Sequence, residues 1–490
     1  MDFNHAIPTA KLIERLHNEN PWWLSGQAPK NYREMAKRPY FNLFYPLVKN
    51  TDVRRTVLLM GARRVGKTVM IFHAIQQLIG EKIPPQKIFF IGIDNPIYAN
   101  MGLEDILLLA KEAVQLEQME GCYVFFDEIQ YLKDWERHLK VLTDSYPKTK
   151  FTVSGSAGAT LRMPRTESGA GRFTDFILPP LTFHEYIHLK GLSHLVQLKS
   201  IIYNTKETPF FTAHDCKALN KEFLQYLNFG GYPEVGLSAK AQSHVGRFIK
   251  SDIIDKVLLR DLPSLYGIKD VRELNSFFSH LAYHTGQEFS FEKLTKGGYK
   301  KEVIKKYLEY LEAAFLIKVI HKIDDHAKKF KRITGFKVYL TNTSLRTAIF
   351  SPVHETDLEA GRLAETAVFS QWMHRENLDL KYAQWRNGRT EGEVDMVSID
   401  HRFLKPQWCA EIKWSDRYFD LPKELKSLHY FCKQNNFKAA LVTTLEKTGN
   451  KTAEGLNITF VPAAVYAYNI GVKTTEQKTG LITLWEPSDF

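Results

Sequence analysis

Residues 57–68 read Val-Leu-Leu-Met-Gly-Ala-Arg-Arg-Val-Gly-Lys-Thr, and this stretch decides the fold of the segment around it. The apolar run 57–60 predicts a strand, and Val-Met-Ile-Phe at 69–72 predicts the start of a helix. The residues between them match the G-x-x-x-x-G-K-[ST] pattern of a phosphate-binding loop. Glycines let backbone N–H groups turn towards phosphate oxygens, and the helix N-terminus adds its positive end. An ordinary glycine-rich turn is the alternative, and the flanking strand and helix argue against it.

The loop predicts which residues would hold a nucleotide and its magnesium ion. Lys67 would place its ammonium group on the β- and γ-phosphates, and Thr68 would offer its hydroxyl to Mg²⁺. The rest of the loop, with Gly61, Arg64 and Gly66, would surround the phosphates. ATP and Mg²⁺ are therefore the predicted cofactors.

A second apolar run supplies two acidic residues. Residues 122–126 read Cys-Tyr-Val-Phe-Phe and are followed by Asp127 and Glu128. A run that is apolar throughout is typical of a parallel strand, which is buried on both faces. Asp127 would complete the Mg²⁺ shell, and Glu128 would orient and deprotonate the attacking water. Acidic residues after an apolar strand are common, but a phosphate loop about sixty residues upstream makes a nucleotide hydrolase the favoured interpretation.

Two further groups are candidates for contact with the γ-phosphate. The segment 150–156 reads Lys-Phe-Thr-Val-Ser-Gly-Ser, a strand that ends in hydroxyls. If it lies beside the acidic strand, Ser154 or Ser156 would sense the phosphate; a strand that simply runs into a turn is equally consistent. Arg172 is either an arginine finger that stabilises the transferring charge or a surface arginine.

Residues 54–190 resemble the AAA-superfamily predicted ATPases of bacteria and archaea that carry a C-terminal domain of unknown function. The resemblance implies an ATP-binding α/β fold, a five-stranded parallel sheet flanked by helices. The sequence pattern alone gives only alternating strands and helices. The matching stretches are Gly61–Thr68, Asp127-Glu-Ile-Gln-Tyr-Leu-Lys-Asp-Trp-Glu136, Ser154-Gly-Ser156, Gly171-Arg172 and Leu178-Pro-Pro-Leu-Thr-Phe-His-Glu-Tyr186.

Length and composition limit the remaining possibilities. The chain has 490 residues, enough for roughly three domains. Its formal net charge of +11 indicates a polyanionic partner. The four cysteines include no C-x-x-C pair, which argues against a zinc site or a disulfide framework. With no signal-peptide core and no apolar run long enough to cross a bilayer, we expect a cytoplasmic protein without a membrane partner.

The pattern divides the chain into five segments. Trp22 and Trp23 in the first of them are expected to pack against the next segment rather than to stack on bases. The third is rich in predicted helix and would form a lid or bridge over the nucleotide. The segments are 1–50, packing on the ATPase; 51–190, the P-loop AAA-type domain; 191–265, the helical bridge; 266–345, a winged helix-turn-helix; and 346–490, a nuclease-like α/β domain.

The winged helix-turn-helix is predicted from three helices and a hairpin. Residues 271–282 and 300–314 predict amphipathic helices, and Ser290 would cap a short helix between them. Strands at 317–323 and 336–340 follow, joined by a charged turn. This order of elements is typical of a DNA-binding module whose third helix enters the major groove.

Charge supports a DNA partner for this segment. Residues 293–337 hold thirteen basic and five acidic residues, a net +8 out of the chain's +11. A local excess of this kind predicts contact with DNA phosphates, and a solvated surface that contacts protein is the alternative. The residues expected to contact DNA belong to the predicted recognition helix and wing: Lys300, Lys301, Lys305, Lys306, Lys328, Lys329, Lys331 and Arg332.

Paired carboxylates appear near the C-terminus. Residues 391–400 and 408–414 predict two strands with a turn near Pro406, and Glu411 and Lys413 share one face of the second strand. If the register brings Asp395 beside Glu411, the set can hold Mg²⁺ and position a water for phosphodiester attack.

With Glu365 on the predicted helix 361–369, this set resembles the PD-(D/E)XK nuclease fold, in which a helix glutamate precedes an Asp…Glu-x-Lys core. The resemblance implies a metal site formed by Glu365, Asp395 and Glu411, with Lys413 beside it. It leaves open whether the domain cleaves DNA or is an inactive scaffold.

Three functions are consistent with these features. The preferred one is an ATP-hydrolysing, DNA-binding enzyme of repair, recombination or genome defence, acting on DNA that includes branched structures, as a homo-oligomer and with or without nuclease activity. The second is a nucleotide-gated regulatory switch with an inactive nuclease-like DNA-binding scaffold. The third is a non-catalytic DNA-binding adaptor, against which the intact Lys67, Asp127 and Glu128 argue.

Overall fold

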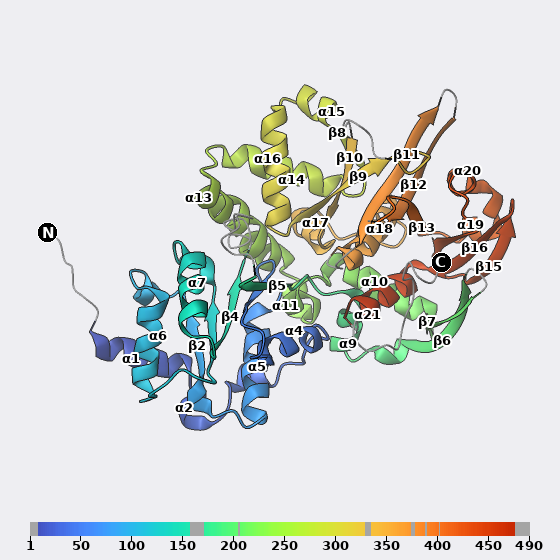
Figure 1. Cartoon of the computed structure of the whole chain (residues 1–490). Helices are drawn as coiled ribbons and strands as arrows, with labels where there is room; N and C mark the ends of the chain where they lie inside the picture. The colour runs from blue at the N-terminus through green and yellow to red at the C-terminus, as the bar shows by residue number, and fades with distance from the viewer. Residues whose placement is uncertain are drawn as a thin grey trace. The chain divides into compact units, whose positions relative to one another are not determined.

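The computed structural model describes residues 8–156, 171–203, 206–328, 335–373, 378–387, 390–400 and 402–475. The chain divides into two compact units, Met1–Leu178 and Pro179–Phe490. Each unit has a sheet of its own (Figure 1).

The first unit contains the predicted five-stranded parallel sheet. Its strand order is β2-β3-β4-β1-β5, and every neighbouring pair is parallel. Every residue of β1, β2, β3 and β4 is buried, as expected for parallel strands covered on both faces. The strands are β1 (Thr56–Met60), β2 (Ile88–Gly92), β3 (Tyr123–Asp127), β4 (Lys150–Gly155) and β5 (Phe173–Ile177).

Helices from before and between the strands complete this unit (Figure 1). Trp22 and Trp23 are buried, and both indole Nε1 atoms donate to the Ile88 carbonyl of β2 at 2.9 Å. Packing rather than base stacking is therefore the role of both tryptophans. The helices are α1 (Thr9–Glu19), α2 (Trp22–Ser25), α3 (Lys30–Arg33), α4 (Phe41–Lys49), α5 (Lys67–Gly80), α6 (Leu103–Ala113) and α7 (Trp135–Ser145).

The second unit is built on a nine-stranded sheet of order β15-β16-β14-β13-β12-β11-β9-β10-β8. Strands β11, β12 and β13 pair antiparallel, and β14 joins β13 in parallel. The strands are β8 (Glu288–Ser290), β9 (Ile317–Ile323), β10 (Gly335–Leu340), β11 (Asp379–Asn387), β12 (Thr390–Ile399), β13 (Pro406–Glu411), β14 (Ala439–Thr444), β15 (Gly449–Ala453) and β16 (Leu456–Pro462).

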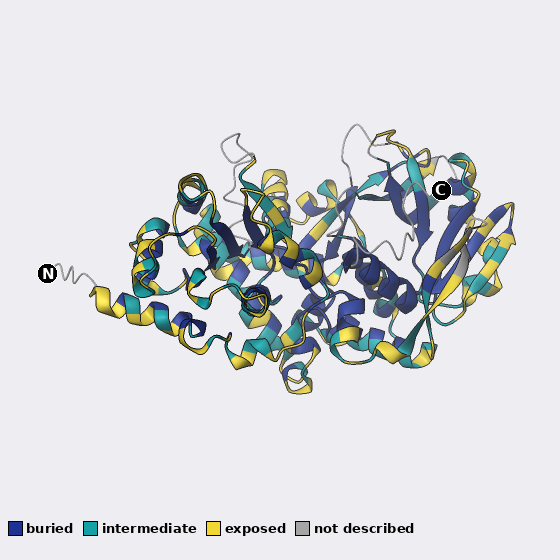
Figure 2. Cartoon of the chain, turned by 60° about the horizontal axis from the view of Figure 1, so that its bottom comes forward, coloured by how far each residue is buried: buried dark blue, intermediate teal, exposed yellow. Residues whose placement is uncertain are grey.

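Two hydrophobic clusters cover opposite faces of this sheet. Met396 belongs to the cluster with α9 (Phe183–Leu189), α10 (Cys216–Phe229), α18 (Leu358–Trp372) and α21 (Ala463–Thr475), whereas its neighbour Val397 belongs to the cluster with α20 (Lys426–Gln434). This alternation follows the period of two along a strand. Figure 2 shows most of these strands in the dark blue of buried residues. No helix in the described part of the chain is long and apolar enough to span a bilayer.

The elements predicted for residues 266–345 are present. They are α14 (Val271–Tyr283), β8, α15 (Phe291–Lys296), α16 (Lys301–Ala313), β9 and β10, and the Ser290 hydroxyl accepts from the Lys293 N–H as the predicted cap. Strand β9 pairs with β10 on one edge and with β11 on the other, because its second edge would otherwise leave backbone groups unpaired. One sheet therefore crosses the boundary predicted at residue 345, and α9, N-terminal to the boundary predicted at 190, lies in the second unit.

The segment 191–265 is less helical than predicted. Strands β6 (Val196–Tyr203) and β7 (Lys206–Ala213) form a separate antiparallel pair. The alternation Val196-Gln-Leu198-Lys is a strand pattern that the prediction of a helical bridge overlooked. The remainder contains α10 and two π-helical stretches, η6 (Gly246–Asp255) and η7 (Val257–Asp261).

Packing requires a glycine at position 231 of this segment. A Cβ atom on Gly231 would lie 2.1 Å from the Asn342 side chain, so that only glycine fits there. Asn342 is buried and accepts from the N–H and the hydroxyl of Ser344 at 2.8 and 2.6 Å.

Candidate functional site

The phosphate loop lies between β1 and α5, at the carboxyl end of the parallel sheet. A Cβ atom on Gly61 would lie 2.3 Å from the Leu178 carbonyl oxygen, and Gly66 has φ 97°, a left-handed conformation that favours glycine. Both glycines of the pattern are thus required by the backbone.

Two basic side chains hold this loop in shape. Lys67 is buried, and its Nζ donates to the carbonyls of Gly61 and Ala62 at 3.1 and 3.0 Å. Arg38 is also buried, and its Nη1 donates to the Val65 carbonyl at 2.7 Å. Support of the loop by Arg38 could not be predicted from the sequence, because the contact spans 27 residues.

Asp127 accepts hydrogen bonds from two other residues predicted for the nucleotide site, Thr68 and Ser154. Thr68 donates from Oγ1 to Asp127 Oδ2 at 2.8 Å, and the Ser154 hydroxyl donates to the other carboxylate oxygen. Burial, together with repulsion from Glu128, raises the pKa of Asp127 to about 6. A buried carboxylate beside a hydroxyl fits a divalent cation, which takes oxygen ligands and would offset the buried negative charge.

Glu128 follows in a left-handed backbone conformation, with φ 55°. Its N–H donates to Ser154 Oγ at 3.1 Å, and its carboxylate accepts from the Gln130 amide. Gln130 in turn accepts from the Ser156 N–H at 3.2 Å. Ser154 and Ser156 therefore hold the two acidic residues directly and through Gln130. Gln130 was missed as a site residue, although it stands two residues after Glu128, within the stretch 127–136 that carries the family resemblance.

Arg172 lies at the opposite end of the sheet. Its carbonyl accepts from the Thr56 N–H at 2.9 Å, where β1 begins, and its Nε pairs with Asp144 Oδ1 at 3.1 Å. A five-residue strand spans roughly 16 Å, and the phosphate loop begins after the other end of β1. Arg172 is thus too far away to act on a nucleotide bound by its own chain.

The four residues that resemble a nuclease site, Glu365, Asp395, Glu411 and Lys413, lie close together in the second unit. The pairing of Met396 with Ala410 places Asp395 opposite Glu411, the register on which the sequence argument depended. Lys413 Nζ lies 3.2 Å from Asp395 Oδ2 and 2.8 Å from Glu411 Oε1.

A second lysine, Lys337 of β10, lies inside the same cluster. Its side chain is 3% exposed, and its Nζ is 3.0 Å from Glu365, 2.7 Å from Glu393 and 4.0 Å from Asp395. Tyr339, on the same face of β10, donates its hydroxyl to Glu365 at 2.6 Å. Lys337 was counted with the basic residues of a DNA-facing surface, and its burial removes it from that surface.

The charges of the cluster depend on burial and on the two ammonium groups. Burial and repulsion from Asp395 raise the pKa of Glu411 to about 7, and burial likewise raises that of Glu365. Burial would raise the pKa of Asp395 as well, but Lys413 and Lys337 outweigh it and lower the value. The carboxylate groups of Glu365, Glu393 and Asp395 raise the pKa of Lys337 despite its burial.

The predicted metal set is not formed in this arrangement. Among the described residues, no group of three His, Cys, Asp or Glu side chains could hold a metal ion. Lys337 and Lys413 supply the positive charge that a cation would otherwise bring, so the carboxylates are already paired. The residues as they lie therefore do not fit the metal that the nuclease resemblance implies.

The lysines predicted to contact DNA differ in their surroundings. Lys300, Lys301, Lys305 and Lys306 are exposed at the start of α16, and Lys328, in the predicted wing, is exposed too. Lys329, Lys331 and Arg332 lie outside the described residues. Other basic residues of the segment are paired, for example Lys318 with Glu312 and Lys322 with Glu288.

Comparison with known families places the phosphate loop in context. Residues 53–187 match the sequence model of a family described as an AAA domain, and residues 220–356 match one described as a domain of unknown function (DUF8612). The AAA match covers all five strands of the parallel sheet, so the first unit has a P-loop AAA-type α/β fold. Neither match covers the part of the second unit that carries Glu365, Asp395 and Glu411.

Similar proteins that match over most of their length are described as uncharacterised. A protein of Haemophilus influenzae is 25% identical over 413 residues, covering 82% of this chain and 92% of its own length. A protein of Methanocaldococcus jannaschii is 23% identical over 369 residues, covering 74% of this chain and 76% of its own. Among solved structures, the Aeropyrum pernix ORC1 protein in complex with DNA is 11% identical, with 70% of this chain and 92% of that chain covered at a TM-score of 0.24, too low to establish a common fold.

We predict that Lys337→Met destabilises the second unit by about 3–5 kcal/mol, because Glu365, Glu393 and Asp395 lose a buried counter-ion. Urea unfolding of the full chain measures the change. Mn²⁺ should recover part of the loss in this variant, since three carboxylates would then need a cation.

The matched control is Lys318→Met on the neighbouring strand, where a half-exposed pair contributes at most about 1 kcal/mol. Equal losses in the two variants, or an Mn²⁺ effect as large in the unmodified chain, would contradict the role of Lys337.

Proposed function

We propose that the protein binds ATP with Mg²⁺ and hydrolyses it. One observation carries this proposal: Lys67, Thr68, Asp127 and Ser154 meet at the carboxyl end of a five-stranded parallel sheet. The AAA-domain match over residues 53–187 supports it. Catalysis in such a site is mainly positioning and charge stabilisation.

The chain's own residues have separable roles in this proposal. Lys67 leaves the carbonyls of Gly61 and Ala62 to bind phosphate oxygens. Thr68 and Asp127 hold the magnesium ion, which neutralises charge on the phosphates when bound. Glu128, held by Gln130 and by the Ser154 hydroxyl, takes the proton of the attacking water.

Arg172 enters this proposal only through a neighbouring copy of the chain. Because Arg172 is far from the phosphate loop of its own chain, an arginine-finger role requires a homo-oligomer. There Arg172 would break its ion pair with Asp144 and approach the nucleotide bound by the adjacent copy.

DNA is the partner that we propose for the second unit. The order α14-β8-α15-α16-β9-β10, with β8 paired to β10 and β10 to β9, supports the proposal of a winged helix-turn-helix. Four exposed lysines, Lys300, Lys301, Lys305 and Lys306, cluster at the start of α16. Together with the ATPase, this supports a DNA-processing ATPase of repair, recombination or genome defence.

The second candidate is a nucleotide-gated switch whose nuclease-like part is an inactive scaffold. The order α18-β11-β12-β13-α20-β14, with β13 antiparallel to β12 and parallel to β14, supports the PD-(D/E)XK resemblance. The pairing of Asp395 and Glu411 with Lys413, and of Glu365 with Lys337, favours a scaffold over a metal-dependent nuclease.

We expect Lys67→Ala to abolish ATP binding and Glu128→Gln to bind ATP but to lose at least about a hundredfold in kcat, since a general base is worth that much or more. A fluorescent ATP analogue measures binding, and phosphate release measures turnover. Glu112→Gln, on the exposed face of α6, is the matched control and should turn over normally. Normal turnover in Glu128→Gln would overturn the catalytic assignment.

We expect DNA binding to weaken with salt and to be lost when Lys300, Lys301, Lys305 and Lys306 are all changed to Glu. Each phosphate contact removed should lower the slope of log K against log salt by about one. Fluorescence anisotropy with duplex, single-stranded and branched DNA measures both. Unaltered affinity in the fourfold variant would rule out α16 as the DNA-binding helix.

We expect no DNA cleavage by the full chain with Mg²⁺ or Mn²⁺, because Lys337 and Lys413 already neutralise the carboxylates. End-labelled duplex, single-stranded and branched DNA are the substrates. Cleavage that disappears in Asp395→Ala while ATP turnover persists would contradict the scaffold and establish the nuclease.

A further inference from the structure

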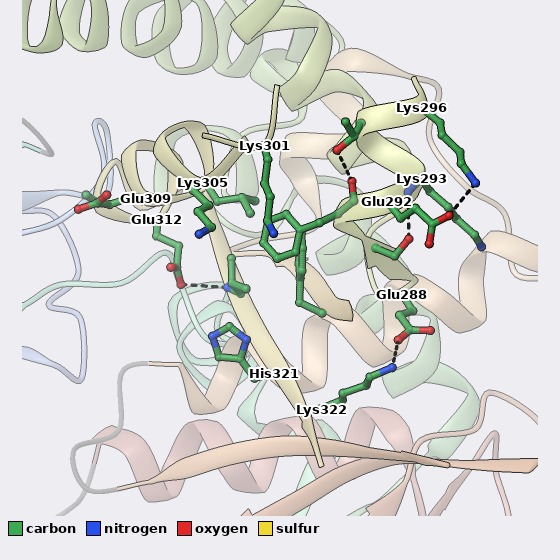
Figure 3. A pocket seen from close by; sticks show the side chains of 17 residues that line it. Glu288, Glu292, Lys293, Lys296, Lys301, Lys305, Glu309, Glu312, His321 and Lys322 are labelled. Carbon is green, nitrogen blue, oxygen red and sulfur yellow. Dashed lines mark hydrogen bonds and ion pairs between the residues drawn. The ribbon is translucent and has the colours of Figure 1, made fainter. Parts of the chain in front are cut away.

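A groove of about 1390 Å³ runs between two helices and the end of the large sheet. One side is formed by α15 and α16, and the other by β8, β9 and Phe336 of β10. Figure 3 shows Lys301 projecting from α16 into the groove, with Lys305 on the same helix and with Lys293 and Lys296 on α15 at the other end of the groove. The groove is larger than most small-molecule sites and is open to solvent, which suits a polymer segment.

Ion pairs neutralise most of the acidic residues that line the groove. Among its acidic residues, Glu288 pairs with Lys322 at 2.9 Å, Glu292 with Lys296 at 2.7 Å and Glu312 with Lys318 at 3.5 Å. Within the described part of the chain, no ion pair engages the other lysines of the lining: Lys293, Lys301 and Lys305. Glu309, further along α16, is the acidic residue left to oppose them.

An aromatic surface lies beside these lysines. Phe291 is half-buried, and its ring centroid is 5.0 Å from that of Phe336. Lys301 Nζ is 5.9 Å from the centroid of the Phe291 ring. Lysines that follow a phosphate backbone beside a ring that can stack on a base are the chemistry of single-stranded nucleic acid sites.

We propose that this groove holds a single-stranded segment of nucleic acid, with phosphates on Lys293, Lys301 and Lys305 and an unpaired base against Phe291. A duplex reader needs the helix to stand free, because the major groove of about 12 Å must take the whole helix. The face of α16 that carries Lys301 and Lys305 instead looks across the groove towards β9. Lys300 and Lys306 do not line the groove and remain available to duplex DNA.

This inference rests on the proposed DNA binding and names the form of DNA that the groove takes. The experiment compares two double variants of the full chain: Lys301→Glu with Lys305→Glu in the groove, and, as the matched control, Lys217→Glu with Lys221→Glu, an exposed pair of the same spacing on α10. The probes are an oligothymidylate of about 16 nucleotides and a hairpin duplex, measured by anisotropy over a salt series.

We expect the groove variant to lose at least about tenfold in affinity for oligothymidylate and to lower its salt slope by about 1.4, the value for two phosphates on a single strand. The control should lose less than about threefold for this probe. Phe291→Ala should lose about tenfold at constant salt slope, and Phe291→Tyr, which keeps the ring, should bind as the unmodified chain does. Melting curves verify that each variant is folded.

Equal losses in the groove and control variants, or a groove variant that loses duplex and not oligothymidylate, would overturn the single-strand site while leaving DNA binding intact. Absence of binding to either probe in the unmodified chain would overturn the proposed DNA partner itself.

Discussion

The buried ammonium group of Lys337 is the interaction on which the second unit depends. It joins β10 to Glu365 on α18 and to Glu393 and Asp395 on β12. Taking one cation and several carboxylates out of water is costly unless their geometry and hydrogen bonds are good. The Tyr339 hydroxyl donates to Glu365, and the Ile412 N–H donates to Asp395 at 2.8 Å. The network thus links β10 to α18 and β12 within the second unit.

The first unit depends on a different constraint, the common edge of a parallel sheet. Because all five strands run the same way, the loops after β1, β3 and β4 meet at one end. Lys67, Asp127 and Ser154 reach the same point from three different strands or their loops, and Arg172, at the start of β5, is excluded from it. Topology alone therefore separates the residues that can share one site from Arg172, which lies at the other end of the sheet.

The sequence predicted local patterns well and long-range partners poorly. The phosphate loop, the acidic strand end and the pairing of Asp395 with Glu411 follow from motifs or from the period of two within a hairpin. Lys337 was missed because its carboxylate partners lie 28 or more residues away, and no periodicity relates one strand to another. The hairpin β6–β7 was missed for a simpler reason, since a short alternating stretch stood inside a segment rich in helix signals.

Charge counting failed in an instructive way between residues 293 and 337. A net charge describes the field at a distance, but contact with phosphate needs ammonium groups that are exposed and unpaired. Lys337 is buried, Lys318 and Lys322 face glutamates, and Lys296 is held by Glu292. Within the described residues of this range, the exposed lysines that no ion pair engages are Lys328, Lys293 and the four at the start of α16. Of these, Lys293, Lys301 and Lys305 line the groove beside Phe291. The exposed and unpaired positive charge is therefore smaller than the net +8 suggests, but part of it lies beside an aromatic ring. A basic groove with such a ring has the features of a site for single-stranded nucleic acid, which a basic face without a ring lacks.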